Sequence, residues 1–116
     1  MGKDFTAAGY WNGLLNASLC KLFILRALRE GPGHGYEIAQ RVKRLTEGFC
    51  VPTDGTIYPA LHEFEECGCI TCRSEIVAGR TRKVYTLTEK GHEAYRAGKV
   101  VWQKGLGCMD CVVGEE

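Results

Sequence analysis

The chain has 116 residues, of which 45% are apolar and 25% charged, and its formal net charge is +1. This length argues for one domain rather than two, and the composition is typical of a soluble globular domain. No apolar run approaches the roughly 20 residues that a membrane span needs, so no membrane partner is expected. The start has Lys3 beside Asp4 and no continuous apolar core, which argues against a signal peptide and predicts a cytoplasmic protein. Because the cytosol keeps thiols reduced, the 7 cysteines do not indicate a disulfide framework.

Charged residues are unevenly distributed along the chain. Basic residues outnumber acidic ones in 21–44 and again in 73–104, whereas 47–66 carries acidic side chains but no lysine or arginine. Such asymmetry is compatible with a nucleic-acid face, although the total charge alone would not suggest one.

The first half of the chain predicts three helices. Apolar residues recur at helical spacing in 19–28, and Gly31-Pro32-Gly33 ends that helix. A second amphipathic segment occupies 36–45. Thr53 or Asp54 is a suitable N-cap for a third helix, in which Pro59 fits only near the first turn or at a kink.

The second half predicts a hairpin and a last helix. Apolar and polar residues alternate from Ile70 onward, so 70–87 is predicted to be a β-hairpin with a basic tip and a turn at 78–81. Thr88 opens a final helix, whose end we expect Gly105 and Gly107 to weaken.

This order of elements is that of a winged helix-turn-helix. The sequence therefore predicts an α+β, mostly α fold with an additional C-terminal helix. We divide it into an N-terminal arm (1–17), a winged helix domain (18–88) and a C-terminal helix with a cysteine-containing tail (89–116). In such a fold the third helix enters the major groove, and the cations of the wing meet phosphates or the adjacent minor groove.

Three blocks of sequence sharpen this expectation. They are ILRALREGPGHGYEIAQRV (24–42), VPTDGTIYPALHEFEECGCI (51–70) and GRTRKVYTLTEKG (79–91). In this order and spacing they resemble the PadR family of bacterial transcription regulators. The resemblance implies a homodimer that represses a promoter by binding its double-stranded operator DNA and that a ligand releases. It also implies that the last helix is the dimerisation helix, as in the short subgroup of the family. We expect no required cofactor.

Nine residues are predicted to contact DNA. Hydroxyls and free N–H groups at a helix start bind phosphates well, which selects the start of the third helix. Polar and basic side chains of the second helix and of the wing are further candidates for phosphate contacts. The predicted set is Tyr36, Lys43, Arg44, Thr53, Thr56, Tyr58, Arg80, Arg82 and Lys83.

The third helix carries no cation beyond its first turns. Phosphate would repel Glu63, Glu65 and Glu66, so we expect these side chains to point away from DNA. Affinity should then depend on the wing and on the two heads of a dimer, and should fall steeply with salt. The same acidic residues leave open an adaptor that kept the fold but lost DNA binding.

The resemblance also implies a small aromatic effector. In the short subgroup a tryptophan on the last helix lines a cavity at the dimer centre, and Trp102 occupies the corresponding place. Trp11 is the second candidate for this site. Packing in the dimer interface is the alternative for both, since tryptophan is enriched in interfaces.

The cysteines depart from the family pattern. Cys67, Cys69 and Cys72 cluster after the third helix, and Cys108 and Cys111 form a C-x-x-C. If the tail folded back onto the hairpin, these thiols would hold a thiophilic metal or act as a redox sensor. Small apolar filling is the alternative, because residues 69 and 72 of a strand point to opposite faces. A thiol enzyme is not expected, because the C-x-x-C does not start a helix in a βαβ unit.

Two further cysteines lie nearer the start of the chain. Cys20 falls in the apolar stripe of the first helix and is expected to fill the core. Cys50 precedes the third helix, whose positive end would lower the pKa of its thiol.

Overall fold

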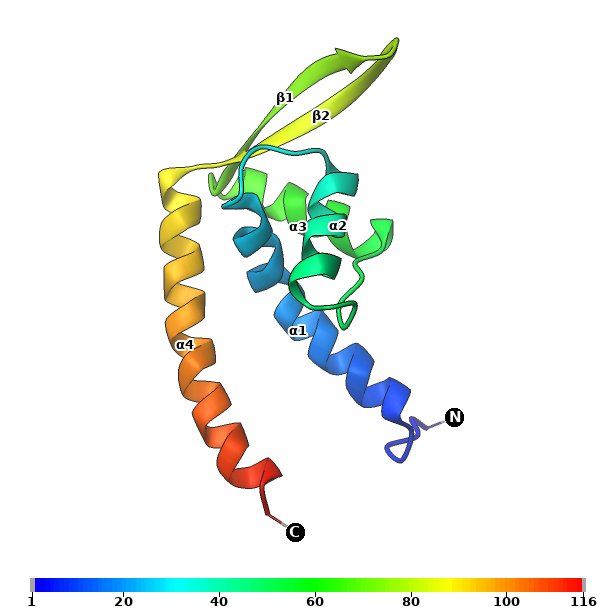
Figure 1. The fold of residues 1–116 in the computed structure, drawn as a ribbon, viewed down its shortest axis with the longest axis vertical. Helices are drawn as coiled ribbons and strands as arrows, with labels where there is room; N and C mark the ends of the chain where they lie inside the picture. The colour runs from blue at the N-terminus through cyan, green and yellow to red at the C-terminus, as the bar shows by residue number, and fades with distance from the viewer. Residues whose placement is uncertain (1, 116) are drawn as a thin grey trace.

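The computed structural model describes residues 2–115, so Met1 and Glu116, the outermost residues of the predicted arm and tail, lie outside it. Helices α1, α2 and α3 pack together, the hairpin projects from one end, and α4 runs back along α1 (Figure 1). This mostly helical arrangement with one two-stranded antiparallel sheet confirms the predicted winged helix fold. The elements are α1 (Ala8–Leu28), α2 (Gly35–Leu45), α3 (Asp54–Glu66), β1 (Ile70–Val77), β2 (Arg80–Leu87) and α4 (Glu89–Val113).

The core lies where α1, α2, α3 and the base of the hairpin meet. Its side chains come from the apolar positions that repeat at helical spacing, and full burial of each contributes about 1.5–3 kcal/mol. The largest fully buried side chains are Ile24, Leu28, Ile38, Val42, Ile57, Leu61 and Ile70.

Among the described helices, none is long and apolar enough to cross a lipid bilayer.

Helix α1 begins earlier than its apolar stripe. It starts at Ala8, so most of the predicted arm is the first part of this helix. The ring of Phe5 lies edge-on to that of Tyr10, with centroids 5.1 Å apart, and the indole N–H of Trp11 donates to the Phe5 carbonyl at 2.8 Å. These contacts fold the preceding residues back onto the helix start.

Helix α3 begins as the sequence predicts, with Thr53 as its N-cap residue. The Thr53 hydroxyl lies 3.2 Å from the Thr56 hydroxyl, and it accepts no backbone N–H of the helix. Pro59 lies inside the helix, in its second turn, where it removes the N–H that would bond to the Gly55 carbonyl.

The hairpin is tighter than predicted. Ala78 and Gly79 both have left-handed backbones, with φ of 51° and 77°, so the turn needs only these two residues. The base is anchored because Gly33 and Tyr85 exchange backbone hydrogen bonds of 3.1 Å and 2.9 Å. The distal half projects from the body, and Ile76 there is 78% exposed.

The corner between α3 and β1 is fastened to the start of α4. The Thr88 hydroxyl accepts the Gly91 N–H and donates to the Gly68 carbonyl at 2.7 Å. The Lys90 ammonium donates to the Cys67 carbonyl at 2.6 Å. From this anchor α4 continues to Val113, so the expected weakening at residues 105 and 107 does not end the helix.

Replacing Gly91 by alanine is expected to destabilise the fold by about 2–3 kcal/mol, because a new methyl group overpacks this corner. A Cβ there would lie 2.2 Å from the Cys69 carbonyl oxygen and 2.4 Å from Leu87 Cδ1. Urea unfolding measures the change. Gly107→Ala is the matched control, since a Cβ there meets open space on the side of α4 opposite to Gly98, and it should stabilise the same helix by about 0.5–1 kcal/mol. Equal stabilities of the two variants would contradict the close approach at Gly91.

Candidate nucleic-acid interface

An open hollow of about 720 Å³ lies where the starts of α2 and α3 face β2. It brings together predicted DNA contacts from three elements: Tyr36, Tyr58, and the pair Arg82 and Lys83. Two of the predicted tyrosines and two of the predicted cations therefore line one concave surface. The remaining lining residues are His34, Gly35, Thr81 and Tyr85.

Gly35 allows the Tyr58 ring to lie against the start of α2. A Cβ at position 35 would come within 2.6 Å of that ring. Gly35 was not among the predicted site residues, although the G-H-G stretch before the second helix is a local signal for such a close approach. Tyr85 was missed as well, because its place under the hollow depends on backbone pairing with Gly33 across the fold.

A histidine at the edge of the hollow contacts both α2 and the wing. The His34 N–H donates to Glu37 Oε1 at 3.0 Å, and this hydrogen bond holds the pKa of Glu37 below its usual value. The His34 ring contacts Glu37 through Nδ1, and its Nε2 lies 3.4 Å from Glu75 of β1. His34 thus links the start of α2 to the wing.

The other predicted DNA contacts lie outside the hollow. Thr53 and Thr56 are exposed at the start of α3, and Arg80 is exposed at the tip of the hairpin. Lys43 is exposed on α2 and forms no ion pair with any described residue. Arg44 is already paired with Glu30, so its charge is partly engaged within the chain.

Arg41 is basic but belongs to the scaffold. Its guanidinium donates to the carbonyls of Gly31 at 2.7 Å and Pro32 at 3.0 Å. A longer contact of 3.4 Å reaches the Ala27 carbonyl. Arg41 of α2 therefore satisfies carbonyl groups in the last turn of α1 and in the loop that follows it.

Two acidic residues of α3 form ion pairs with neighbouring side chains. Glu63 forms an ion pair of 2.9 Å with Lys21 of α1, and Glu66 one of 2.9 Å with His62. Neither carboxylate lines the hollow. Both are therefore directed away from the surface where the tyrosines and wing cations meet.

The predicted metal or redox cysteines are not gathered into one site. Cys69 is buried, Cys72 half-buried and Cys67 exposed at the α3–β1 corner, whereas Cys108 and Cys111 are exposed near the far end of α4 (Figure 1). Throughout residues 2–115, no group of three or more His, Cys, Asp or Glu side chains is placed to hold a metal ion. The two C-x-x-C pairs thus stay apart within one chain.

The expected low pKa of Cys50 is wrong. Burial raises the pKa of this thiol, and it outweighs any effect of the helix start that follows. Cys20 fills the core as expected and is 3% exposed.

The two tryptophans lie on different helices. Trp11 is 54% exposed on α1, whereas Trp102 is half-buried on α4. Helices α1 and α4 approach closely near Leu22 and Gly98. A Cβ added at position 98 would lie 3.0 Å from the Leu22 side chain. Within the described part of the chain, the rings of the two tryptophans do not pack on one another.

Comparison with known proteins points to one family. The model of the "Transcriptional regulator PadR-like family" matches residues 24–97. Transcriptional regulator YqjI of Escherichia coli (strain K12) is 38% identical over 71 residues, which cover 61% of this chain and 33% of YqjI. Transcriptional regulator Rv3488 of Mycobacterium tuberculosis is 35% identical over 74 residues, which cover 64% of this chain and 66% of Rv3488. The chain thus spans only about a third of YqjI's length.

Solved structures share the fold. Bacillus subtilis PadR in complex with operator DNA is similar with a TM-score of 0.64 and 31% identity, over 71% of this chain and 47% of that one. Putative transcriptional regulator TA0346 of Thermoplasma acidophilum is similar with a TM-score of 0.74 and 27% identity, over 86% and 95% of the two chains. In the first of these neighbours, the shared fold is bound to operator DNA.

Proposed function

The chain belongs to the PadR-like family of transcriptional regulators, and from this premise we propose that it is a homodimeric repressor that binds operator DNA and is released by a ligand. The family and its named relatives are transcriptional regulators and not enzymes, in agreement with the expectation from the sequence. Its DNA partner would place the protein in the cytoplasm.

The observation that carries the DNA-binding proposal is the hollow between α2, α3 and β2. Tyr36 is 70% exposed at its rim, and the ring of Tyr58 forms its floor against Gly35. The major groove of B-DNA admits a helix, and hydroxyls beside a helix start bind the flanking phosphates. Arg82 and Lys83 would then meet the backbone next to the inserted α3.

The dimer proposal is supported by an apolar face that the chain leaves uncovered. Where α4 packs on α1, Gly98 is at the contact; the same helix face continues through Trp102, Leu106, Met109 and Val113. Leu106 is 60% and Met109 53% exposed. Such a stripe, together with exposed apolar residues on the first half of α1, is suited to a second copy of the chain.

The effector proposal follows from the same face. A half-buried Trp102 at the edge of this stripe would become a cavity wall once a partner covers it. A planar aromatic compound would stack on its ring, with Trp11 as the second candidate wall. The pairing of Glu63 with Lys21 and of Glu66 with His62 favours DNA binding over the adaptor alternative.

Fluorescence anisotropy with a DNA fragment from the protein's own promoter tests this function. The protein is expected to bind the fragment at low salt. Its affinity should fall about a thousandfold between 50 and 200 mM salt if it contacts six phosphates. A scrambled fragment of equal length is the control and should bind at least about a thousandfold more weakly. Absence of binding at low salt, with or without added aromatic compounds, would rule out the repressor. Release by an aromatic compound that Trp102→Ala abolishes would support the effector site.

A further inference from the structure

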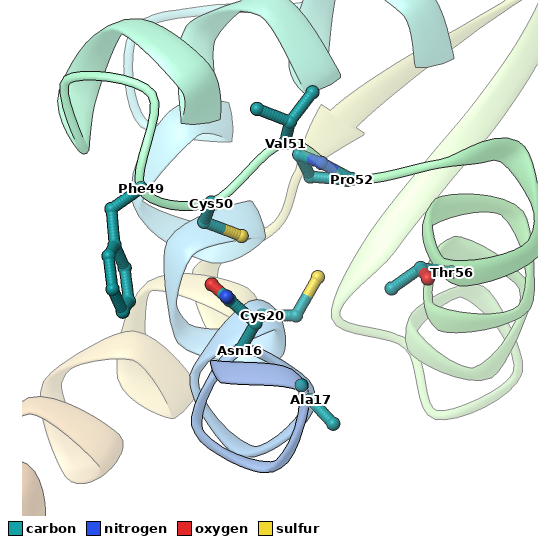
Figure 2. Close-up of a pocket in the computed structure, with 9 residues that line it drawn as sticks. Asn16, Ala17, Cys20, Phe49, Cys50, Val51, Pro52 and Thr56 are labelled. Atoms are coloured by element: carbon teal, nitrogen blue, oxygen red, sulfur yellow. The ribbon is translucent and has the colours of Figure 1, made fainter. Parts of the chain in front are cut away.

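A second pocket lies between α1 and the connection from α2 to α3, with a volume of about 440 Å³. Cys20 of α1 and Cys50 of the connection both line it, and each is only 3% exposed. Figure 2 shows both thiols turned into the space between the helix and the connection. These two cysteines are distant in the sequence and were expected to have unrelated roles.

The thiols are close enough to affect one another's ionisation. Burial raises the pKa of Cys20 to about 11, and the neighbouring Cys50 thiol adds to the increase. Burial also raises the pKa of Cys50. Both groups are therefore protonated near neutral pH. Since peroxides react with thiolates, this pair is poorly suited to peroxide sensing.

A third donor atom faces the same region. Asn16 lines the pocket one helical turn before Cys20, and its Oδ1 is buried without a hydrogen-bond partner. Its Nδ2 donates to the Asn12 carbonyl at 3.0 Å, which fixes the orientation of the amide. A buried acceptor with no partner is costly unless something binds it.

We propose that Cys20 and Cys50, with Asn16 Oδ1 nearby, form a binding site for a soft divalent metal ion of low coordination number, represented by Hg(II). Two sulfur ligands satisfy such an ion, whereas structural zinc needs four ligands that the described residues do not offer here. The ion forms two metal–sulfur bonds and releases the two thiol protons to solvent. The product is a neutral dithiolate complex, which a buried apolar site tolerates better than a charged one.

The site has a consequence for DNA binding, which rests on the proposed function. Cys50 lies three residues before Thr53, the N-cap of α3, and Cys20 lies in the middle of α1. A bound ion would therefore tie the entry of α3 to the helix that also carries the exposed apolar residues Trp11 and Leu14. Loading should change operator affinity by tenfold or more.

The test uses this chain with four other cysteines replaced by serine: Cys67→Ser, Cys72→Ser, Cys108→Ser and Cys111→Ser. Hg(II) binding is followed by its ultraviolet thiolate absorption in competition with glutathione. Replacing Cys20 or Cys50 by alanine should lower the affinity for Hg(II) by at least about 100-fold, because the second thiolate is no longer held at high effective concentration. Cys69→Ala removes another buried thiol and is the matched control, which should bind one equivalent as the parent does.

Equal Hg(II) affinities of the Cys20→Ala, Cys50→Ala and Cys69→Ala variants would overturn the site. If an alanine variant does not fold by circular dichroism, X-ray absorption of Hg(II) on the Cys69→Ala protein decides instead. Two sulfur neighbours support the proposal and a single one refutes it. Operator titrations with and without Hg(II) test the coupling separately, so loss of DNA binding would not be mistaken for loss of the metal site. Unchanged operator affinity after loading would overturn the coupling.

Discussion

Replacing Leu106 and Met109 together by glutamate is expected to produce a monomer and to weaken operator binding by about 100-fold or more. Both side chains are more than half exposed on the α4 face that continues beyond the contact with α1. In a dimer they would be buried, and each unpaired carboxylate would cost several kcal/mol. Light scattering reports the mass in solution, and anisotropy titrations report the affinity.

The matched control for this double variant is Lys104→Glu. It changes the net charge by the same amount, and residue 104 is exposed on the side of α4 opposite to residues 106 and 109. The control should remain dimeric with a normal melting temperature. A double-glutamate variant that is still dimeric would place the interface elsewhere on the chain.

Loss of the dimer should weaken DNA binding more than loss of any one contact. A winged helix head covers one half-site, and two linked heads bind adjacent half-sites with a high effective concentration for the second. The monomer should therefore keep the weak, salt-sensitive binding of a single head. This residual binding separates an interface variant from one that has lost its fold.

Local patterns were enough to predict most of the fold. The switch from helical to alternating spacing at Ile70 marks the wing, and Thr53 marks the start of α3. The start of α1 was not predicted, because Gly9 and Gly13 lower helix propensity and no apolar stripe of helical spacing runs through the segment before residue 19. Helix α4 likewise continues through Gly105 and Gly107, because a low helix propensity at single positions does not end a long helix.

The site was harder to predict where a residue's partner is distant in the chain. Arg41 has the spacing of a surface cation, but its guanidinium donates to carbonyls of the loop that follows α1. The position of Cys50 before a helix predicts a low pKa, yet burial raises the pKa of this thiol and outweighs the opposite effect of its hydrogen bond with Cys20. Tyr58 and the wing cations were predicted from local chemistry, and the hollow that joins them depends on Gly35.

Removing the three wing cations is expected to have the second large effect on DNA binding. The variant carries Arg80→Ala, Arg82→Ala and Lys83→Ala, and its operator affinity should fall by at least about 100-fold at 100 mM salt. Arg82 and Lys83 line the hollow, whereas Arg80 extends the positive surface to the hairpin tip. If all three contact phosphates in both protomers, the slope of log affinity against log salt should decrease in magnitude by about 5.

The salt slope distinguishes lost phosphate contacts from a damaged fold. In the strand register Arg82 lies opposite Glu75, so its loss removes a cross-strand pair of about 0.2–1 kcal/mol, too little to unfold the hairpin. The triple control Arg96→Ala, Lys99→Ala and Lys104→Ala removes the same charge from exposed positions of α4. It should keep the parent slope, because net charge acts at long range whereas counterion release requires contact. A wing variant with the parent slope and a weakened affinity would mean that the wing positions the protein without touching phosphate.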